Sequence, residues 1–246
     1  MTDNRNKRTR VAVVTGAGGG VGGRLVHTLA ANGWRVLAVV RKDSDVRELD
    51  AIDGVQAHLV DLLDAEGIER WTAWVNEHEP DGIDLLANVA AVASVGSIET
   101  ATADVWDTVL RTNVVAPALL TRGLLPAIRR TRGSIVFVNS GAGERAIPNH
   151  AVYASSKHAL RALANTIRLE EAGNGVRVGT VYPGQIDTGM LRGIDETLGV
   201  EFHGEDYIRP QTVADAIVWI ANAPDDVHIT NVDLRPRQEV SSSFNV

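Results

Sequence analysis

The sequence predicts an α/β protein in which a doubly wound parallel sheet of about seven strands lies between two layers of helices. Short runs of β-branched residues without polar alternation recur along the chain, and segments of 3.6-residue periodicity separate them. Strand and helix that alternate in this way form right-handed βαβ crossovers, so ligands are expected at the carboxyl ends of the strands. The 246 residues suffice for one compact domain over residues 1–246.

Five apolar runs are expected to form strands buried on both faces, because they contain almost no polar residues. They are Val11–Val14, Val36–Val40, Leu85–Ala87, Ile135–Val138 and Val176–Tyr182. Val55–Val60 and His228–Leu234 mix in polar residues and are weaker strand candidates.

The segments between these runs carry apolar residues at helical spacing. Helices are predicted over Val21–Leu29, Ile68–Val75, Val105–Ile128, Tyr153–Leu169 and Val213–Ile220. Pro117 and Pro126 lie in the longest of them, so we expect a kink or break there. The polar segment 189–209 interrupts the pattern and is the best candidate for a mobile lid.

Composition excludes several classes of function. The 24 basic residues face 31 acidic ones, a net charge of −7, which argues against a nucleic-acid partner. Cysteine is absent, and the histidines form no cluster, so we predict no metal site. The first apolar run has four residues, too few for a signal peptide or membrane span. We therefore expect a cytoplasmic protein without a membrane partner.

A glycine-rich stretch, Thr15-Gly16-Ala17-Gly18-Gly19-Gly20-Val21-Gly22-Gly23, follows the first strand and opens the first helix. Glycines let the backbone approach a diphosphate closely, and a helix N-terminus offers unpaired N–H groups to the anion. Two registers fit: Gly18, Gly20 and Gly23 match G-x-G-x-x-G, whereas Gly16, Gly20 and Gly22 match T-G-x-x-x-G-x-G. Either one predicts a Rossmann-like, dinucleotide-binding sheet.

The end of the second strand indicates which dinucleotide binds. An acidic residue there would favour NAD(H), but Arg41 and Lys42 occupy this place. A guanidinium can clamp the 2′-phosphate of NADP(H), so we predict NADP(H) in preference to NAD(H). The alternative is a solvated basic loop, since Asp43 and Asp45 lie nearby.

Tyr153 and Lys157 lie one helical turn apart. The chain has three tyrosines and three lysines, so such a pair arises by chance only about 0.04 times. The spacing places both side chains on one face of a helix. A nearby ammonium lowers the pKa of a phenol toward the working pH of a general acid/base. Standing alone, the pair could equally be a surface tyrosine stacked on a lysine.

From Val11 to about Pro236 the chain resembles the short-chain dehydrogenase/reductase family, in its single-domain type of about 250 residues. The resemblance rests on several motifs beside the tyrosine–lysine pair. They are Thr15-Gly16…Gly20-Val21-Gly22, Asp61, Asn88-Val89-Ala90-Ala91, Asn113, Ser140 and Pro183-Gly184-Gln185-Ile186-Asp187-Thr188.

The resemblance implies a catalytic role for four residues. Tyr153 would donate or accept the proton of an alcohol/carbonyl pair, and Lys157 would hold the nicotinamide ribose and lower the tyrosine pKa. Ser140, which lies 13 residues before the tyrosine, would bind the substrate oxygen. Asn113 would position a water that relays protons to the lysine.

The resemblance also implies the cofactor contacts. Asp61 and Leu62 would meet the adenine, and Asn88 and Ala90 the ribose. The remaining contacts would come from Gly16, Gly20, Val21, Gly22, Arg41, Pro183, Gly184, Ile186 and Thr188, together with Tyr153 and Lys157.

The predicted function is thus NADP(H)-dependent hydride transfer between an alcohol and a ketone or aldehyde. Val89 and Ala91 depart from the family's Asn-Asn-Ala-Gly, which keeps open a non-catalytic dinucleotide sensor on the same fold. The expected pocket walls are Gly141, Ala142, His150, Gln185, Met190 and Leu191, together with the segment 189–209, and the substrate is expected to be a small molecule. The resemblance also implies a homodimer or homotetramer.

Overall fold

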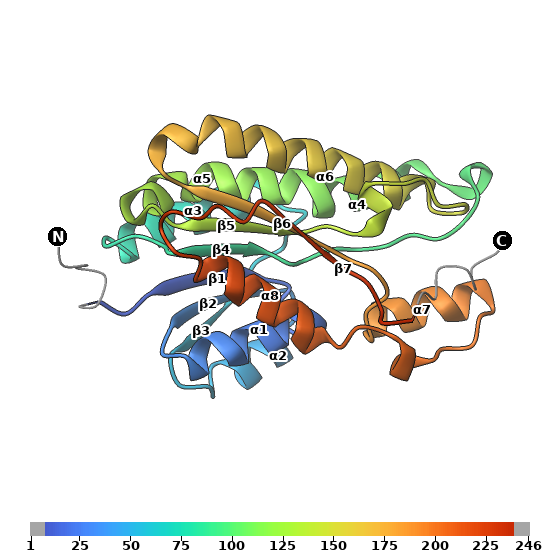
Figure 1. Cartoon of the computed structure of the whole chain (residues 1–246), viewed down its shortest axis with the longest axis horizontal. Coiled ribbons are helices and arrows are strands. Elements are labelled where there is room, and N and C mark those ends of the chain that lie inside the picture. The colour runs from blue at the N-terminus through green and yellow to red at the C-terminus, as the bar shows by residue number, and fades with distance from the viewer. Residues whose placement is uncertain (1–7, 239–246) are drawn as a thin grey trace.

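A parallel sheet forms the centre of the molecule. The computed structural model describes residues 8–238, so residues 1–7 and 239–246 of the predicted domain lie outside the described residues. Within 8–238 the sheet has seven strands in the order β3-β2-β1-β4-β5-β6-β7, and all neighbours are parallel. The strands are β1 (Val11–Thr15), β2 (Arg35–Val40), β3 (Val55–Leu59), β4 (Leu85–Asn88), β5 (Ser134–Val138), β6 (Arg177–Pro183) and β7 (Asn231–Leu234). This confirms the predicted fold class (Figure 1).

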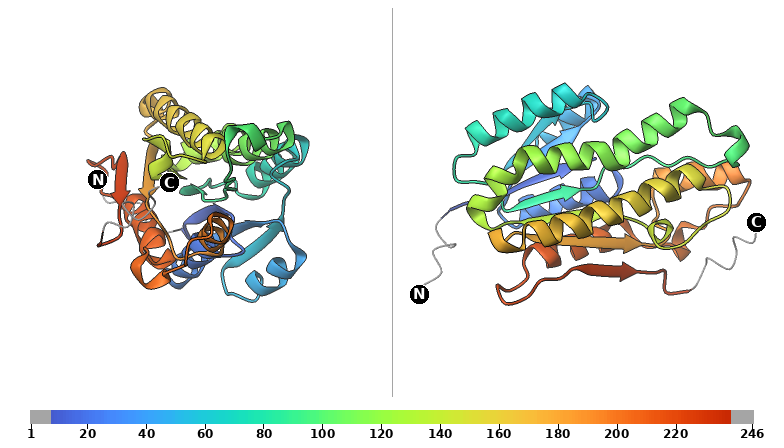
Figure 2. Two further views of the ribbon diagram at one scale, coloured as in Figure 1. Left: turned by 90° about the vertical axis from the view of Figure 1, so that its right-hand side faces the viewer. Right: turned by 90° about the horizontal axis from the view of Figure 1, so that it is seen from above.

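Two layers of helices cover the sheet (Figure 2). The core on one face contains residues of α1 (Gly20–Ala31), α2 (Asp43–Leu49) and α8 (Pro210–Ala221). The core on the other face contains residues of α3 (Ala65–His78), α5 (Ala116–Thr131) and α6 (Ala151–Glu170). Along β1, Ala12 and Val14 belong to the first core, while Val11 and Val13 belong to the second. Burial on both faces explains why these strands lack polar alternation.

The helix predicted over Val105–Ile128 is divided. The structure has α4 (Ala103–Leu110), then a π-helical turn over Arg111–Val115, then α5. In this turn the N–H of Ala116 bonds the carbonyl of Arg111, five residues earlier. Pro117 has no N–H to offer the carbonyl of Asn113 four residues before it, which favours the wider turn. Pro126 lies inside α5 without ending it.

The polar segment 189–209 is more regular than its composition predicts. It contains the helix α7 (Gly189–Leu198) and a 3₁₀ turn, Gly204–Asp206. The hydroxyl of Thr188 caps α7 by accepting from the N–H of Leu191 at 3.3 Å. Gly199 ends it in the left-handed conformation, with φ of 66°. A threonine cap and a terminal glycine are the ordinary signals of helix ends, and they were present in the sequence.

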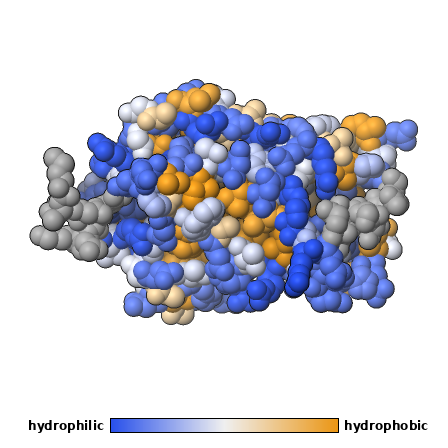
Figure 3. All heavy atoms as spheres, viewed as in Figure 1, coloured by the Kyte–Doolittle hydropathy of each residue, from blue (hydrophilic) through white to orange (hydrophobic). Residues whose placement is uncertain are grey.

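The last strand lies at one edge of the sheet. β7 pairs only with β6 among the described strands, and it is shorter than the predicted run His228–Leu234. Apolar residues gather across the middle of the face on which β7 and α8 lie (Figure 3). Trp219 of α8 is 58% exposed there. No helix within residues 8–238 is long and apolar enough to cross a membrane.

Candidate active site

A cleft of about 990 Å³ opens at the carboxyl ends of the strands. Most of the residues predicted for the site line it: Gly16, Gly20, Val21, Gly22, Arg41, Asp61, Leu62, Ala90, Ser140, Tyr153, Lys157, Pro183, Gly184, Ile186 and Thr188. Asn88 and Asn113 do not line it, because both side chains are buried behind the wall. The expected pocket residues Gly141, Ala142, His150, Gln185, Met190 and Leu191 also line the cleft.

The glycine turn between β1 and α1 forms one end of the cleft. Gly16 has φ of 66°, and a Cβ there would stand 2.9 Å from the Cα of Ala90. A Cβ on Gly22 would stand 2.1 Å from the carbonyl oxygen of Gly16. By contrast, a Cβ on Gly23 would make only an ordinary contact of 3.4 Å. Of the two registers that fit the sequence, the backbone therefore favours Gly16, Gly20 and Gly22, because a side chain at Gly16 or Gly22 would collide with neighbouring backbone atoms.

Thr15 fastens this turn to the end of β4. Its hydroxyl oxygen accepts from the N–H groups of Val89 and Ala90, at 3.0 and 3.1 Å. The loop that departs from the family pattern is thus held through its backbone, and Val89 packs against the core beside α1. The side-chain amide of Asn88 is buried and has no hydrogen-bond partner among residues 8–238.

Charged residues line the cleft at the ends of β2 and β3. Arg41 and Lys42 are exposed and face it, together with Asp45 of α2. Asp61 follows β3, and its carboxylate accepts from the N–H of Leu63 at 2.9 Å. These residues fit a dinucleotide, because a glycine cradle that a Cβ would fill lies beside cations able to bind a phosphate.

Ser140 and Tyr153 meet on the opposite wall. Ser140 follows β5, and its hydroxyl also accepts from the N–H of Ala142 at 3.2 Å. Tyr153 lies in the first turn of α6 and is half-buried. Burial raises the pKa of the Tyr153 phenol above its usual value, and the hydrogen bond with Ser140 offsets part of this rise. The phenol is therefore protonated at neutral pH in this arrangement.

Lys157 lies one turn further along α6 and is 1% exposed. Its Nζ donates to the carbonyl of Val138 at 3.0 Å and lies 5.7 Å from the centroid of the Tyr153 ring. Burial lowers the pKa of Lys157 to about 8. The lysine is thus held between the end of β5 and the tyrosine. Loss of hydration destabilises its protonated form relative to its neutral form.

Asn113 joins three parts of the site through its side chain. Its Oδ1 accepts from the N–H of Val92 at 2.9 Å, and its Nδ2 donates to the carbonyl of Val92 at 2.8 Å and to the Ser156 hydroxyl at 3.0 Å. The Ser156 hydroxyl in turn donates to the carbonyl of Tyr153 at 2.7 Å. The amide therefore connects the loop after β4 to the first turn of α6. Both N–H groups of the amide are occupied by protein groups, and its oxygen accepts one hydrogen bond.

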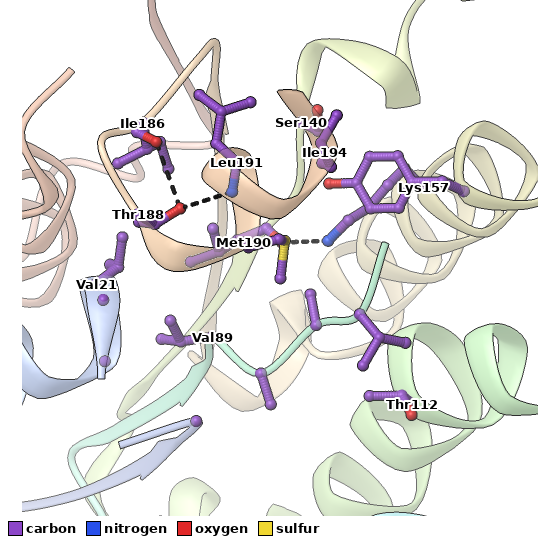
Figure 4. A pocket seen from close by; sticks show the side chains of 18 of the residues that line it. Val21, Val89, Thr112, Ser140, Lys157, Ile186, Thr188, Met190, Leu191 and Ile194 are labelled. Carbon is purple, nitrogen blue, oxygen red and sulfur yellow. Dashed lines mark hydrogen bonds between the residues drawn. The ribbon is translucent and has the colours of Figure 1, made fainter. Parts of the chain in front are cut away.

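Helix α7 covers the middle of the cleft. Figure 4 shows Met190, Leu191 and Ile194 of α7 near Ser140 and Lys157, with Val21 and Val89 on the other side of the space. Ile194 and Leu198 belong to the segment 189–209 that was expected to form part of the pocket wall, and their spacing from Met190 and Leu191 is helical. Arg145, in the loop before α6, was missed; no periodic pattern marks a side chain in an irregular loop.

The sequence matches the family model for short chain dehydrogenases over residues 10–199. The chain belongs to this family of oxidoreductases. An uncharacterized oxidoreductase of Staphylococcus epidermidis is 28% identical over 232 residues, which is 93% of this chain and 98% of the relative. The NADP-dependent 3-hydroxy acid dehydrogenase of Salmonella typhimurium is 28% identical, with 95% of this chain and 96% of the relative covered.

Solved structures have the same architecture. A metagenomic short-chain oxidoreductase in complex with NADP superimposes with a TM-score of 0.78 at 29% identity, covering 94% of this chain and 98% of that one. The alcohol dehydrogenase of the archaeon Thermococcus sibiricus, complexed with 5-hydroxy-NADP, gives 0.81 at 25% identity and covers 94% and 97%. The cleft thus belongs to an oxidoreductase fold, and these two similar structures were solved with NADP and with 5-hydroxy-NADP.

Proposed function

We propose that this protein is an NADP(H)-dependent oxidoreductase that interconverts an alcohol and a ketone or aldehyde by hydride transfer. The observation that carries the proposal is the group Ser140, Tyr153 and Lys157, which lines the same cleft as the glycine turn. A proton-transfer group and a dinucleotide cradle that share one cavity suit carbonyl reduction and alcohol oxidation.

The cofactor would be held along the strand ends. Gly16, Gly20, Val21 and Gly22 would surround the diphosphate, and Asp61 and Leu62 would contact the adenine. The riboses would meet Ala90, Tyr153 and Lys157, and the carboxamide would meet Pro183, Gly184, Ile186 and Thr188. Asn88, which was also expected at a ribose, does not line the cleft and would support this part of it from behind the wall. When bound, NADP(H) supplies or accepts the hydride.

Two observations support NADP(H) over NAD(H). Arg41 and Lys42 line the cleft at the end of β2, where an acidic residue would be expected for NAD(H). The Salmonella relative is an NADP-dependent enzyme, and the metagenomic relative was solved with NADP. A guanidinium at this place can bind the 2′-phosphate with two parallel hydrogen bonds.

Tyr153 would move the proton. Because burial raises the pKa of the phenol, Tyr153 is protonated and can donate to the oxygen of a substrate carbonyl during reduction. The Ser140 hydroxyl would stabilise the charge that develops on that oxygen. In the oxidation direction the ammonium of Lys157 would favour the phenolate. The water relay through Asn113 stays a prediction, and such a water could not accept from the side-chain amide, because both of its N–H groups already donate to protein groups.

Segment 189–209 is proposed as the substrate lid, because α7 places apolar side chains over the cleft. The homo-oligomeric state stays a prediction. The apolar residues on the face that carries β7 and α8 support it (Figure 3). The cytoplasmic location also stays a prediction.

The replacement Tyr153→Phe tests the mechanism. We expect kcat for a panel of ketones and aldehydes to fall by at least about a hundredfold, while the Kd of NADPH changes by less than about twofold, because only the proton donor is removed. The measurement is the absorbance of NADPH in single turnovers, with NADPH binding followed by fluorescence.

Two serine variants give a matched control. Ser140→Ala should slow turnover, whereas Ser155→Ala, an exposed residue of the same region outside the cleft, should not. Near-normal turnover by Y153F would contradict the role of the tyrosine. Tight NADPH binding without oxidation by any carbonyl compound would favour the sensor alternative.

A further inference from the structure

Charge is unevenly distributed along the cleft. The acidic residues that line it, Asp45 and Asp61, belong to the end near β2 and β3. The end near β5 and β6 is lined by two cationic residues, Arg145 and Lys157, and by no carboxylate among residues 8–238. The part of the cleft that contains Tyr153 is therefore positive, and it suits an anion better than a cation.

Lys157 is not free to bind an anionic substituent of a substrate. Its Nζ is buried, donates to the carbonyl of Val138, and lies beside the tyrosine ring. Arg145 differs in both respects: it is exposed at the cleft, and its side chain makes no hydrogen bond or ion pair with residues 8–238. The guanidinium thus keeps all of its donors available in the described part of the chain.

The backbone holds Arg145 at this place. A turn starts at Ser140, where the N–H of Gly143 bonds the Ser140 carbonyl at 2.9 Å and the N–H of Arg145 bonds the Gly141 carbonyl at 3.2 Å. At the other end of the loop, the N–H of Gly96 bonds the carbonyl of Asn149 at 2.8 Å. Arg145 is thus anchored within five residues of the serine that faces the tyrosine.

Neighbouring ionisable groups do not neutralise Arg145. Glu144 is paired with Arg235 at 3.3 Å and does not line the cleft. The Nδ1 of His150 lies 2.7 Å from the carbonyl of Pro148, so in the neutral ring Nδ1 carries the proton and Nε2 is an acceptor. A neutral His150 therefore offers no donor to an anion through Nε2. Arg145 is the residue of this loop that carries a permanent positive charge.

The wall formed by α7 is apolar. Met190, Leu191, Ile194 and Leu198 line the cleft, and three of them are seen near Ser140 and Lys157 in Figure 4. A molecule that reacts at Tyr153 would thus share the cleft with the hydrocarbon side chains of α7 and with a free guanidinium. Such surroundings recognise an aliphatic chain that carries an anionic group.

We propose that Arg145 binds a carboxylate of the substrate, and that the substrate is an aliphatic hydroxy acid or the corresponding oxo acid. This inference rests on the proposed oxidoreductase function and names the substrate class of that site. A planar guanidinium binds a carboxylate through two parallel N–H···O bonds, which also orients the chain toward the tyrosine.

Binding of a probe tests the proposal without turnover. Hexanoate and the neutral hexanamide are titrated calorimetrically into the enzyme saturated with NADP⁺. We expect hexanoate to bind about tenfold more tightly than hexanamide, the scale of a charge-assisted hydrogen bond at an accessible site. Arg145→Gln should abolish this preference, and Arg145→Lys should restore part of it because the charge returns.

Controls separate the site from general electrostatics and from the proposed function. Arg168→Gln makes the same charge change on α6 outside the cleft, and it should leave the preference intact. Y153F should lose turnover but keep the hexanoate preference, so failure of catalysis and failure of carboxylate binding are distinguishable. Equal affinity of wild-type enzyme for the two probes, no binding of hexanoate, or an unchanged preference in R145Q would overturn the proposal.

Discussion

Lys157 shows what burial of a single cation costs. Its side chain is 1% exposed, and desolvation lowers its pKa to about 8. The folded protein therefore binds fewer protons at this site than the unfolded chain between about pH 8 and pH 10.5, the ordinary value. The contribution of Lys157 to the free energy of unfolding therefore rises with pH across that interval. Below about pH 8 the buried lysine is charged, and the folded state carries the full free-energy cost of its desolvation.

Lys157→Met should therefore change the pH dependence of stability. We expect the free energy of unfolding of K157M, relative to wild type, to be most favourable near pH 7 and to lose about 1 to 3 kcal/mol of that advantage by pH 10. Urea unfolding at both pH values measures it, and comparison of the two proteins cancels the other groups that titrate. A difference that does not vary with pH would contradict the buried ammonium.

Arg41 is expected to select the cofactor. Arg41→Ala should raise the Kd of NADPH about tenfold or more, because it removes a charge-assisted contact with the 2′-phosphate, and should change the Kd of NADH by less than about threefold. Fluorescence titration measures both constants. Arg47→Ala, a neighbouring cation of α2 that does not line the cleft, is the control. Equal weakening of both cofactors by R41A would argue against the phosphate contact.

Among single residues, the sequence identified the candidate catalytic residues that line the cleft better than it identified their hydrogen-bond partners. Tyr153, Lys157 and Ser140 could be found because a helix fixes the spacing of the first two and a strand end carries the third. The bond from Lys157 to the Val138 carbonyl joins residues 19 apart, and it depends on how α6 packs against β5. Arg145 lies in a loop, where residue spacing does not indicate direction.

Helix α7 is held in place by a buried polar pair. Asp195 is fully buried, and its Oδ2 accepts from the hydroxyl of Tyr207 at 3.0 Å. Its Oδ1 has no hydrogen-bond partner among residues 8–238. Burial raises the pKa of Asp195, and the bond from Tyr207 offsets part of this rise. The hydroxyl of Tyr207 thus helps to fasten the helix to the chain that follows it, beside the contact between Arg192 and the Phe202 ring.

Tyr207→Phe should loosen this segment. Loss of the hydroxyl leaves a buried carboxylate without a donor, a change that costs about 1 to 3 kcal/mol. We expect faster amide hydrogen exchange in residues 189–208 and unchanged exchange in α6, measured by mass spectrometry. Protection of 189–208 equal to that of wild type would show that the hydroxyl does not hold α7.

The elements themselves were largely predictable. The break near Pro117 was also expected, but its form, a π-helical turn, was not. Buried strands and amphipathic helices have regular periods, so β1, β2 and α6 appear in the sequence. The π turn at Arg111–Val115 is too short to show a periodicity of its own, so the apolar pattern of the sequence runs through α4 and α5 as if they were one helix. The start and stop of α7 were marked by Thr188 and Gly199, but its polar composition obscured them.

For the whole molecule, the sheet brings the two ends of the cleft together from distant parts of the chain. Arg41 follows β2, while Ser140 follows β5. The layered fold could be predicted because alternating strands and helices admit few arrangements. The depth and charge of the cleft could not, since they depend on side chains that meet only after folding.

A ligand that spans this cleft should stabilise the entire fold. NADP⁺ at 100 times its Kd should raise the free energy of unfolding by about 2.7 kcal/mol, seen as a higher Tm in calorimetry. NAD⁺ at the same concentration should raise Tm less. Gly22→Ala should remove the gain, because its Cβ would stand 2.1 Å from the Gly16 carbonyl oxygen and displace the turn. An unchanged gain in G22A would contradict binding at the turn.

The hydroxyl of Thr15 has a kinetic consequence. It holds the N–H groups of Val89 and Ala90, and the N–H of Ala17 bonds the carbonyl of Val39 at 3.2 Å. The glycine turn that is expected to hold the diphosphate is thus tied by hydrogen bonds to the loop after β4 and to the end of β2. Because these segments are already ordered, they lose little conformational entropy when the dinucleotide binds. Association of the dinucleotide with this turn should accordingly not be slowed by a rearrangement of the turn.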